Sequence, residues 1–133
     1  GKRAVDDASA CFSSLSRLSP RIEAAPVGHR IRLLALQFQL LCLTWALLPT
    51  DDKAARAVRD VFHAVTKLLR GKLTDEDCAD IVLAFRPADW PQYAVLSDLC
   101  SDPSPAGVRR AAQGWCKILQ ARLSAEFVFA CSR

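Results

Sequence analysis

Apolar residues recur every three or four positions through most of the chain, and nowhere do they alternate with period two over a useful length. Such spacing places apolar side chains on one face of an α-helix. The pattern predicts helices over residues 4–18, 28–48, 51–70, 74–85, 89–99 and 105–129. Because the links between them are short, we expect neighbours to be antiparallel. The predicted fold class is all-α, a single compact bundle of five to six antiparallel helices.

Capping signals set several of the predicted helix boundaries. Thr50 is a plausible N-cap of the 51–70 helix, and Gly71 follows that helix as its expected C′ residue. Thr74 and Asp77 have the spacing of a capping box. Ser104 precedes a proline at the first position of the last helix.

The organisation along the chain predicts two parts. Residues 19–27 contain two prolines and are expected to form a loop after the first helix. We therefore divide the chain into an N-terminal helix with its proline-bounded loop, residues 1–27, and a helical bundle domain, residues 28–133.

The most apolar run, residues 28–48, is long enough to raise the question of a membrane span. Arg30 and Arg32 stand at its start, and Gln37 and Gln39 interrupt its middle. We expect a central helix packed on most sides by its neighbours, and no insertion into a membrane.

Length and charge narrow the class of protein. The 133 residues suit one domain, and 51% of them are hydrophobic, so disorder is not expected. The chain has no Met and begins with Gly1, which suggests a fragment of a longer protein. The net charge of +4 is mild, and the basic residues are mixed with acids instead of forming one stripe.

The chain has six cysteines at long spacings, several at apolar helix positions. A free cysteine behaves as a small buried hydrophobe. Because disulfides are rare in the cytosol and nucleus, we expect reduced thiols and a cytoplasmic location, with a nuclear one as the alternative.

The sequence carries no residue pattern typical of a metal, cofactor or catalytic site. There is no CxxC, HxxH or HExxH spacing for a metal, and His29 and His63 stand alone. Gly71 and Lys72 resemble the end of a phosphate-binding loop, but Leu73 intervenes and the upstream glycine is missing. We expect no metal, no cofactor and no catalysis.

Two groups of residues are candidates for contact with a partner. Trp90 and Tyr93 lie at a corner fixed by prolines, where aromatic side chains make good anchors, although packing in the core is the simpler alternative for the tryptophan. The second group is a set of basic residues that could bind RNA or an acidic peptide, with an ordinary solvated helix face as its alternative. These are Lys67, Arg70, Lys72, Arg109 and Arg110.

From Asp51 to Leu123 the order of features resembles a known family. The shared features are an amphipathic helix, a Gly-Lys-Leu-Thr turn, a short helix, a tryptophan before the next helix, a Ser-Asp turn and a closing helix. The residues that carry them are Val58, Phe62, Val65, Leu69, Gly71–Thr74, Ile81–Phe85, Trp90, Leu96, Leu99, Ser101, Asp102, Val108, Trp115 and Leu119. The chain is similar there to the C-terminal helical domain shared by the COPII outer-coat scaffold subunit and the steroid receptor RNA activator protein.

This resemblance implies a helical bundle used for protein interaction, with no active-site residues. Its coat branch implies a vesicle-coat appendage in ER-to-Golgi transport, at endoplasmic reticulum exit sites, with other coat subunits as partners. Its activator branch implies a nuclear, RNA-associated coregulator and is the alternative. A viral or parasite adaptor that shares only the bundle geometry is a third interpretation.

Overall fold

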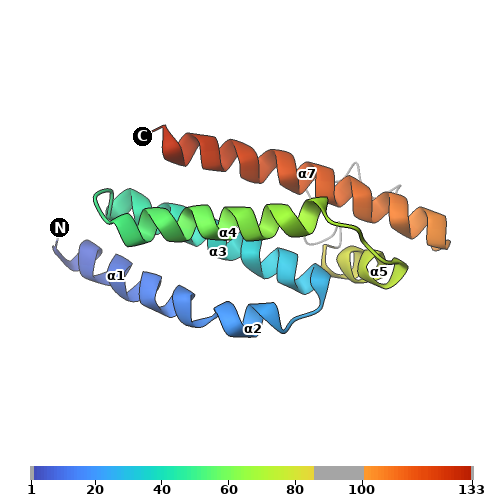
Figure 1. The fold of residues 1–133 in the computed structure, drawn as a ribbon, viewed down its shortest axis with the longest axis horizontal. Coiled ribbons are helices and arrows are strands. Elements are labelled where there is room, and N and C mark those ends of the chain that lie inside the picture. Colours follow the sequence, from blue (N-terminus) through green and yellow to red (C-terminus); the bar gives the residue numbers. More distant parts are fainter. Residues whose placement is uncertain (1, 86–100, 133) are drawn as a thin grey trace.

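A computed structural model describes residues 2–85 and 101–132, and every regular element in these ranges is an α-helix (Figure 1). The predicted all-α fold is confirmed: the helices pack against one another as a bundle. The helices are α1 (Lys2–Arg17), α2 (Ser19–Glu23), α3 (Val27–Leu47), α4 (Asp52–Arg70), α5 (Asp75–Ala84) and α7 (Pro105–Cys131). The predicted 89–99 helix lies outside the described residues.

Helix α3 is the centre of the bundle, and it packs against α1, α2, α4, α5 and α7. Ile31, Phe38 and Leu41 are among its fully buried residues. Within the described ranges it is also the one helix long and apolar enough to span a membrane. A central helix of a bundle can have the same length and composition, but only 39% of this apolar stretch is buried, so the core accounts for one face of α3 and not for the other.

Neighbours pack around most sides of α3, but the described helices leave one face of it uncovered. Leucines on the side away from Phe38 remain exposed, and Leu43 has 65% of its surface accessible to solvent. The reason is geometric: the packed neighbours gather on the inward face and its flanks, and none of them covers the outward one.

Aromatic side chains from α3, α4 and α7 meet at the inward face of α3. The ring of Phe38 lies 5.8 Å from that of Phe62 on α4 and 6.5 Å from that of Phe127 on α7. Phe62 and Phe127 are stacked at 4.2 Å. Further along the bundle, Trp115 is fully buried and its ring lies 5.4 Å from that of Phe85, so this tryptophan is part of the core.

The start of α3 is fixed directly to α5. The backbone N–H of Gly28 donates to the Asp80 carboxylate, and His29 lies 3.2 Å from the same group. A Cβ at position 28 would come within 2.5 Å of the Asp80 carbonyl oxygen. Glycine is therefore required here for close approach of the two backbones.

The expected loop at residues 19–27 is wrong in its first half, because Ser19–Glu23 forms the short helix α2. Proline stops a helix only where its missing N–H is needed, and Pro20 stands in the first turn, where it is not. Ile22 on this turn is buried in the core, which stabilises it.

Capping predictions are confirmed for the N-termini of α5 and α7 and are wrong at both ends of α4, where Gly71 is the C-cap, with an extended backbone, and not the C′ residue. The Thr74–Asp77 capping box forms with both hydrogen bonds, and Ser104 accepts from the N–H of Gly107 with Pro105 at the first position. For α4 the N-cap is Asp51 and not Thr50: the Asp51 side chain accepts from the N–H groups of Lys53 and Ala54. The prediction missed by one residue because both side chains can cap.

Among the cysteines in the described ranges, Cys11, Cys78, Cys116 and Cys131 are free thiols. Cys78 and Cys116 are buried, whereas Cys131 is exposed. Burial raises the pKa of the Cys116 thiol to about 11 and also raises the pKa of Cys78. Both thiols are therefore neutral near pH 7 and act as core residues.

Candidate functional site

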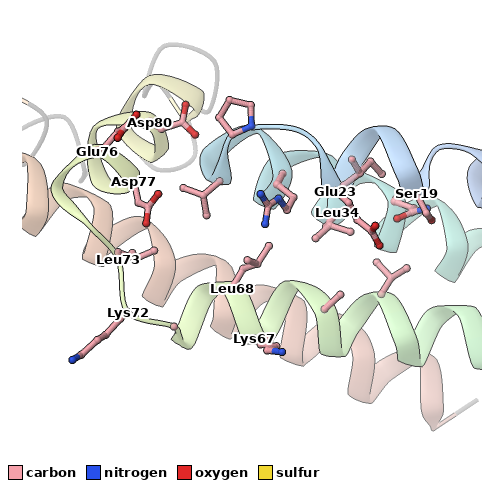
Figure 2. A pocket seen from close by; sticks show the side chains of 18 of the residues that line it. Ser19, Glu23, Leu34, Lys67, Leu68, Lys72, Leu73, Glu76, Asp77 and Asp80 are labelled. Atoms are coloured by element: carbon pink, nitrogen blue, oxygen red, sulfur yellow. The ribbon is translucent and has the colours of Figure 1, made fainter.

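A groove of about 1300 Å³ is bordered by α2, α3, α4 and α5 (Figure 2). We call it the α2–α5 groove. Its floor is apolar and comes from α2, α3, α4 and the link before α5; the floor residues are Ile22, Val27, Leu34, Val61, Leu68 and Leu73. Leu34 on α3 and Leu68 on α4 point into the space between their helices.

The rim of this groove is charged. Acidic side chains outnumber basic ones, and they come from three different helices. The acids are Glu23, Asp60, Glu76, Asp77 and Asp80, and the bases are Arg30, Lys67 and Lys72. The guanidinium of Arg30 donates to the Ala25 carbonyl, and Lys72 points away from the groove in Figure 2. The rim therefore favours a partner that carries positive charge.

Local structure explains why the carboxylates of α5 stand at this rim. The helix begins with Asp75, Glu76 and Asp77, whose charges are favourable beside the positive end of the helix dipole. Asp77 is held by the Thr74 N–H, and Asp80 by Gly28 and His29. Glu76 is exposed and Glu23 is exposed across the groove, so these two carboxylates are accessible to a ligand.

A second hollow, of about 940 Å³, lies on the other side of the 71–74 link, between the end of α4 and α7. We call it the basic cleft, because Arg70, Lys72, Arg109 and Lys117 line it. Arg109 donates to the Leu73 carbonyl and pairs with Asp75, an ion pair that raises the pKa of the guanidinium. Arg70, Lys72 and Lys117 are exposed.

The predicted basic group does not form one surface. Lys67 lines the α2–α5 groove, Arg70 and Arg109 line the basic cleft, and Lys72 borders both. Arg110 lines neither hollow. The N–H of Ser104 donates to the Asp102 carboxylate and lowers the pKa of that group, and Arg110 pairs with the same carboxylate at 3.0 Å. The turn between α4 and α5 therefore separates Lys67 in one hollow from Arg70 and Arg109 in the other, and Arg110 faces neither hollow.

Trp90 and Tyr93 lie outside the described residues, so their role as anchors stays a prediction. The sequence shows the acids at the start of α5 as complements of the helix dipole, but Glu23, Asp60 and Lys117 were not predicted as site residues. Asp60 and Lys117 each stand on the polar face of a helix, where nothing distinguishes them from solvated residues. Only the packing of helices brings them to a hollow.

Within the described ranges, no three side chains of the His, Cys, Asp and Glu types gather in a way that could hold a metal ion. No family model matches the chain, and neither a curated protein nor a solved structure matches it. The function is therefore argued from the two hollows and their chemistry.

Proposed function

We propose that this chain is a non-enzymatic protein-interaction domain that binds a segment of its partner in the α2–α5 groove. The observation that carries this proposal is the groove itself, with its apolar floor and acidic rim. Its volume of about 1300 Å³ exceeds the range of roughly 300–1,000 Å³ that suits a small molecule. An amphipathic helix fits such a groove by placing apolar side chains on the floor and Lys or Arg at the rim.

The resemblance of Asp51–Leu123 to the C-terminal domain of the COPII outer-coat scaffold supports a more specific form of the proposal. The chain would then be a terminal appendage of a COPII-type coat that binds other coat subunits during ER-to-Golgi transport. This assignment rests on the order of helices and turns, and it does not depend on the groove.

A pull-down against inner-coat subunits tests both levels. We expect the chain to enrich a coat subunit, and we expect Asp60→Lys to weaken that binding by about 3- to 10-fold, because it reverses a charge at the rim. Asp7→Lys on α1 is the matched control, since it makes the same change at an exposed helical position away from the groove.

The two levels fail separately. Absence of inner-coat subunits, under conditions in which other coat contacts survive, would exclude the coat assignment. Equal binding by Asp60→Lys and Asp7→Lys would exclude the groove as the binding surface.

A second candidate function, an RNA-associated regulatory protein, is favoured by the basic cleft. Arg70, Lys72 and Lys117 are exposed there and come from two helices and a turn. Phosphate contacts by such residues give binding that weakens steeply with salt. Gel shifts with structured RNA at low and moderate salt test this candidate: Lys117→Glu would abolish a specific shift, and no shift by the native chain would exclude RNA.

A further inference from the structure

Helix α3 carries a row of exposed leucines along its outward face. At 100° per residue they form one line, roughly opposite the buried Ile31 and Phe38. We call this row the leucine stripe; it consists of Leu33, Leu36, Leu40, Leu43 and Leu47, which are 41–65% exposed. A contiguous apolar surface of this kind marks an interaction site on most soluble proteins.

The spacing of the leucine stripe fits another helix. Its steps alternate between three and four residues, which is the repeat that lets two helices pack with a left-handed twist. Residues 33–47 contain no charged side chain, so nothing along the stripe opposes an apolar partner helix. A partner helix must therefore present apolar residues at the same repeat.

The stripe is also symmetric about its middle residue. Leu33 and Leu47 each stand seven residues from Leu40, and Leu36 and Leu43 lie four and three residues from it. If two copies of α3 meet antiparallel, Leu40 faces its own counterpart. Leu33 then faces Leu47 of the second copy, and Leu36 lies beside Leu43. Such a self-complementary surface is what a two-fold dimer requires.

Charges at the two ends of α3 bear on the direction of this pairing. At the N-terminal end the exposed His29 continues the line of the leucine stripe and pairs with Asp80, and Arg32, which flanks the stripe, donates to the Ala84 carbonyl. Asp51 and Asp52 follow the C-terminal end. In the antiparallel register Arg32 of one copy lies toward Asp51 and Asp52 of the other, whereas a parallel pairing would place the acidic ends together.

A shallow hollow beside the stripe provides room for the second copy. It has a volume of about 480 Å³ and lies between Leu43 on α3 and Phe129 on α7, which is 70% exposed. In the antiparallel register this hollow faces Leu36 of the second copy. A specific interface buries roughly 1,000 Å² or more in total, so the contact must extend over the whole stripe.

We propose that two copies of this chain pair through the leucine stripe, antiparallel, with the two-fold axis at Leu40. This homodimer uses a surface other than the α2–α5 groove, so it does not depend on the proposed function. Its consequence is that one assembly presents two grooves, which raises the avidity for a partner with two binding segments.

Analytical ultracentrifugation of the native chain and two matched variants tests the proposal. We expect a concentration-dependent dimer. Leu40→Glu should raise its dissociation constant at least 100-fold (an order-of-magnitude figure), because each substitution acts twice across the axis. Leu83→Glu on α5 is the control: Leu83 is 60% exposed but lies off the stripe, so this variant should dimerise like the native chain.

Cross-linking locates the axis. Leu40→Cys should give a disulfide-linked dimer on oxidation, since its two sulfur atoms meet at the axis, and Leu83→Cys should give no more than the native chain. A monomer at all concentrations, equal effects of Leu40→Glu and Leu83→Glu, or no extra cross-link from Leu40→Cys would each overturn the proposal. So would a monomer whose stripe binds phosphatidylcholine–phosphatidylserine vesicles, because a membrane would then be the occupant.

Discussion

Helices α3 and α4 lie side by side, yet they differ in how their sequences relate to burial (Figure 1). In α4 the buried residues include Val58 and Val65, and the opposite face carries exposed polar residues such as Asp60. In α3 both faces are apolar: Phe38 is fully buried, while Leu43 remains 65% exposed. Polarity therefore identifies the outward face of α4 but not that of α3. The apolar outward face of α3 is the surface of the proposed dimer.

The largest expected effect is on the inward face of α3. Phe38→Ala removes a fully buried ring that packs near Phe62 and Phe127, so the free energy of unfolding should fall by about 3–5 kcal/mol. Urea-induced unfolding at constant protein concentration measures it. A loss below about 1 kcal/mol would contradict the assignment of this face to the core.

The next effect concerns the inward face of α7 and depends on pH. The pKa of the buried Cys116 thiol is about 11 in the folded chain, against an ordinary value of 9.0. As the pH rises above 9, the unfolded chain loses this proton first. The stability contribution of the buried thiol is therefore complete below pH 9 and is lost as the pH rises through 11, at most about 2.7 kcal/mol.

Thermal unfolding across that pH range, compared between the native chain and Cys116→Ala, measures this contribution. The variant should lose less stability between pH 9 and 11 than the native chain does. Cys131→Ala is the control, because Cys131 is exposed and its removal should leave the pH dependence unchanged. Identical pH profiles of all three chains would contradict the role of burial.

A smaller effect tests where α4 begins. Asp51→Ala removes the side chain that accepts from two backbone N–H groups, at 2.9 and 3.3 Å, and should cost about 1 kcal/mol of unfolding free energy. Thr50→Ala should cost much less, since Thr50 is exposed and precedes the cap. Chemical denaturation of both variants distinguishes the two caps, and a larger loss from Thr50→Ala would reverse the assignment.

The smallest effect is expected on the outward face of α3. Leu43→Ser should change the free energy of unfolding by no more than about 0.5 kcal/mol, because the side chain is mostly in water. The measurement belongs in a Leu40→Glu background, in which the proposed dimer does not form. A loss comparable to that of Phe38→Ala would show that α3 is covered on both faces, and the contrast with α4 would disappear.

Much of the fold could be predicted from local sequence. The range 51–70 agrees with α4 to one residue, because its apolar stripe is continuous and its polar face clear. The Thr74–Asp77 box and Pro105 were also identified, since capping involves neighbours in sequence. The short helix α2 was missed because it depends on burial of Ile22 by distant residues.

The candidate site was less predictable than the fold. Lys67 and Lys72 were identified, but they belong to different hollows, with Lys72 at the border of both. Glu23 and Asp60 stand 37 positions apart, and no local pattern links them. Their shared groove exists only because α2 and α4 both pack on α3.

By itself, the sequence determined the helical class and most helix boundaries, because backbone hydrogen bonds, caps and apolar repeats act over a few residues. It also determined that α3 has two apolar faces. Which face enters the core was decided by the tertiary structure, through contacts such as that of Phe38 with Phe127, 89 positions away. The leucines left outside, and the acids gathered at one groove, follow from that choice.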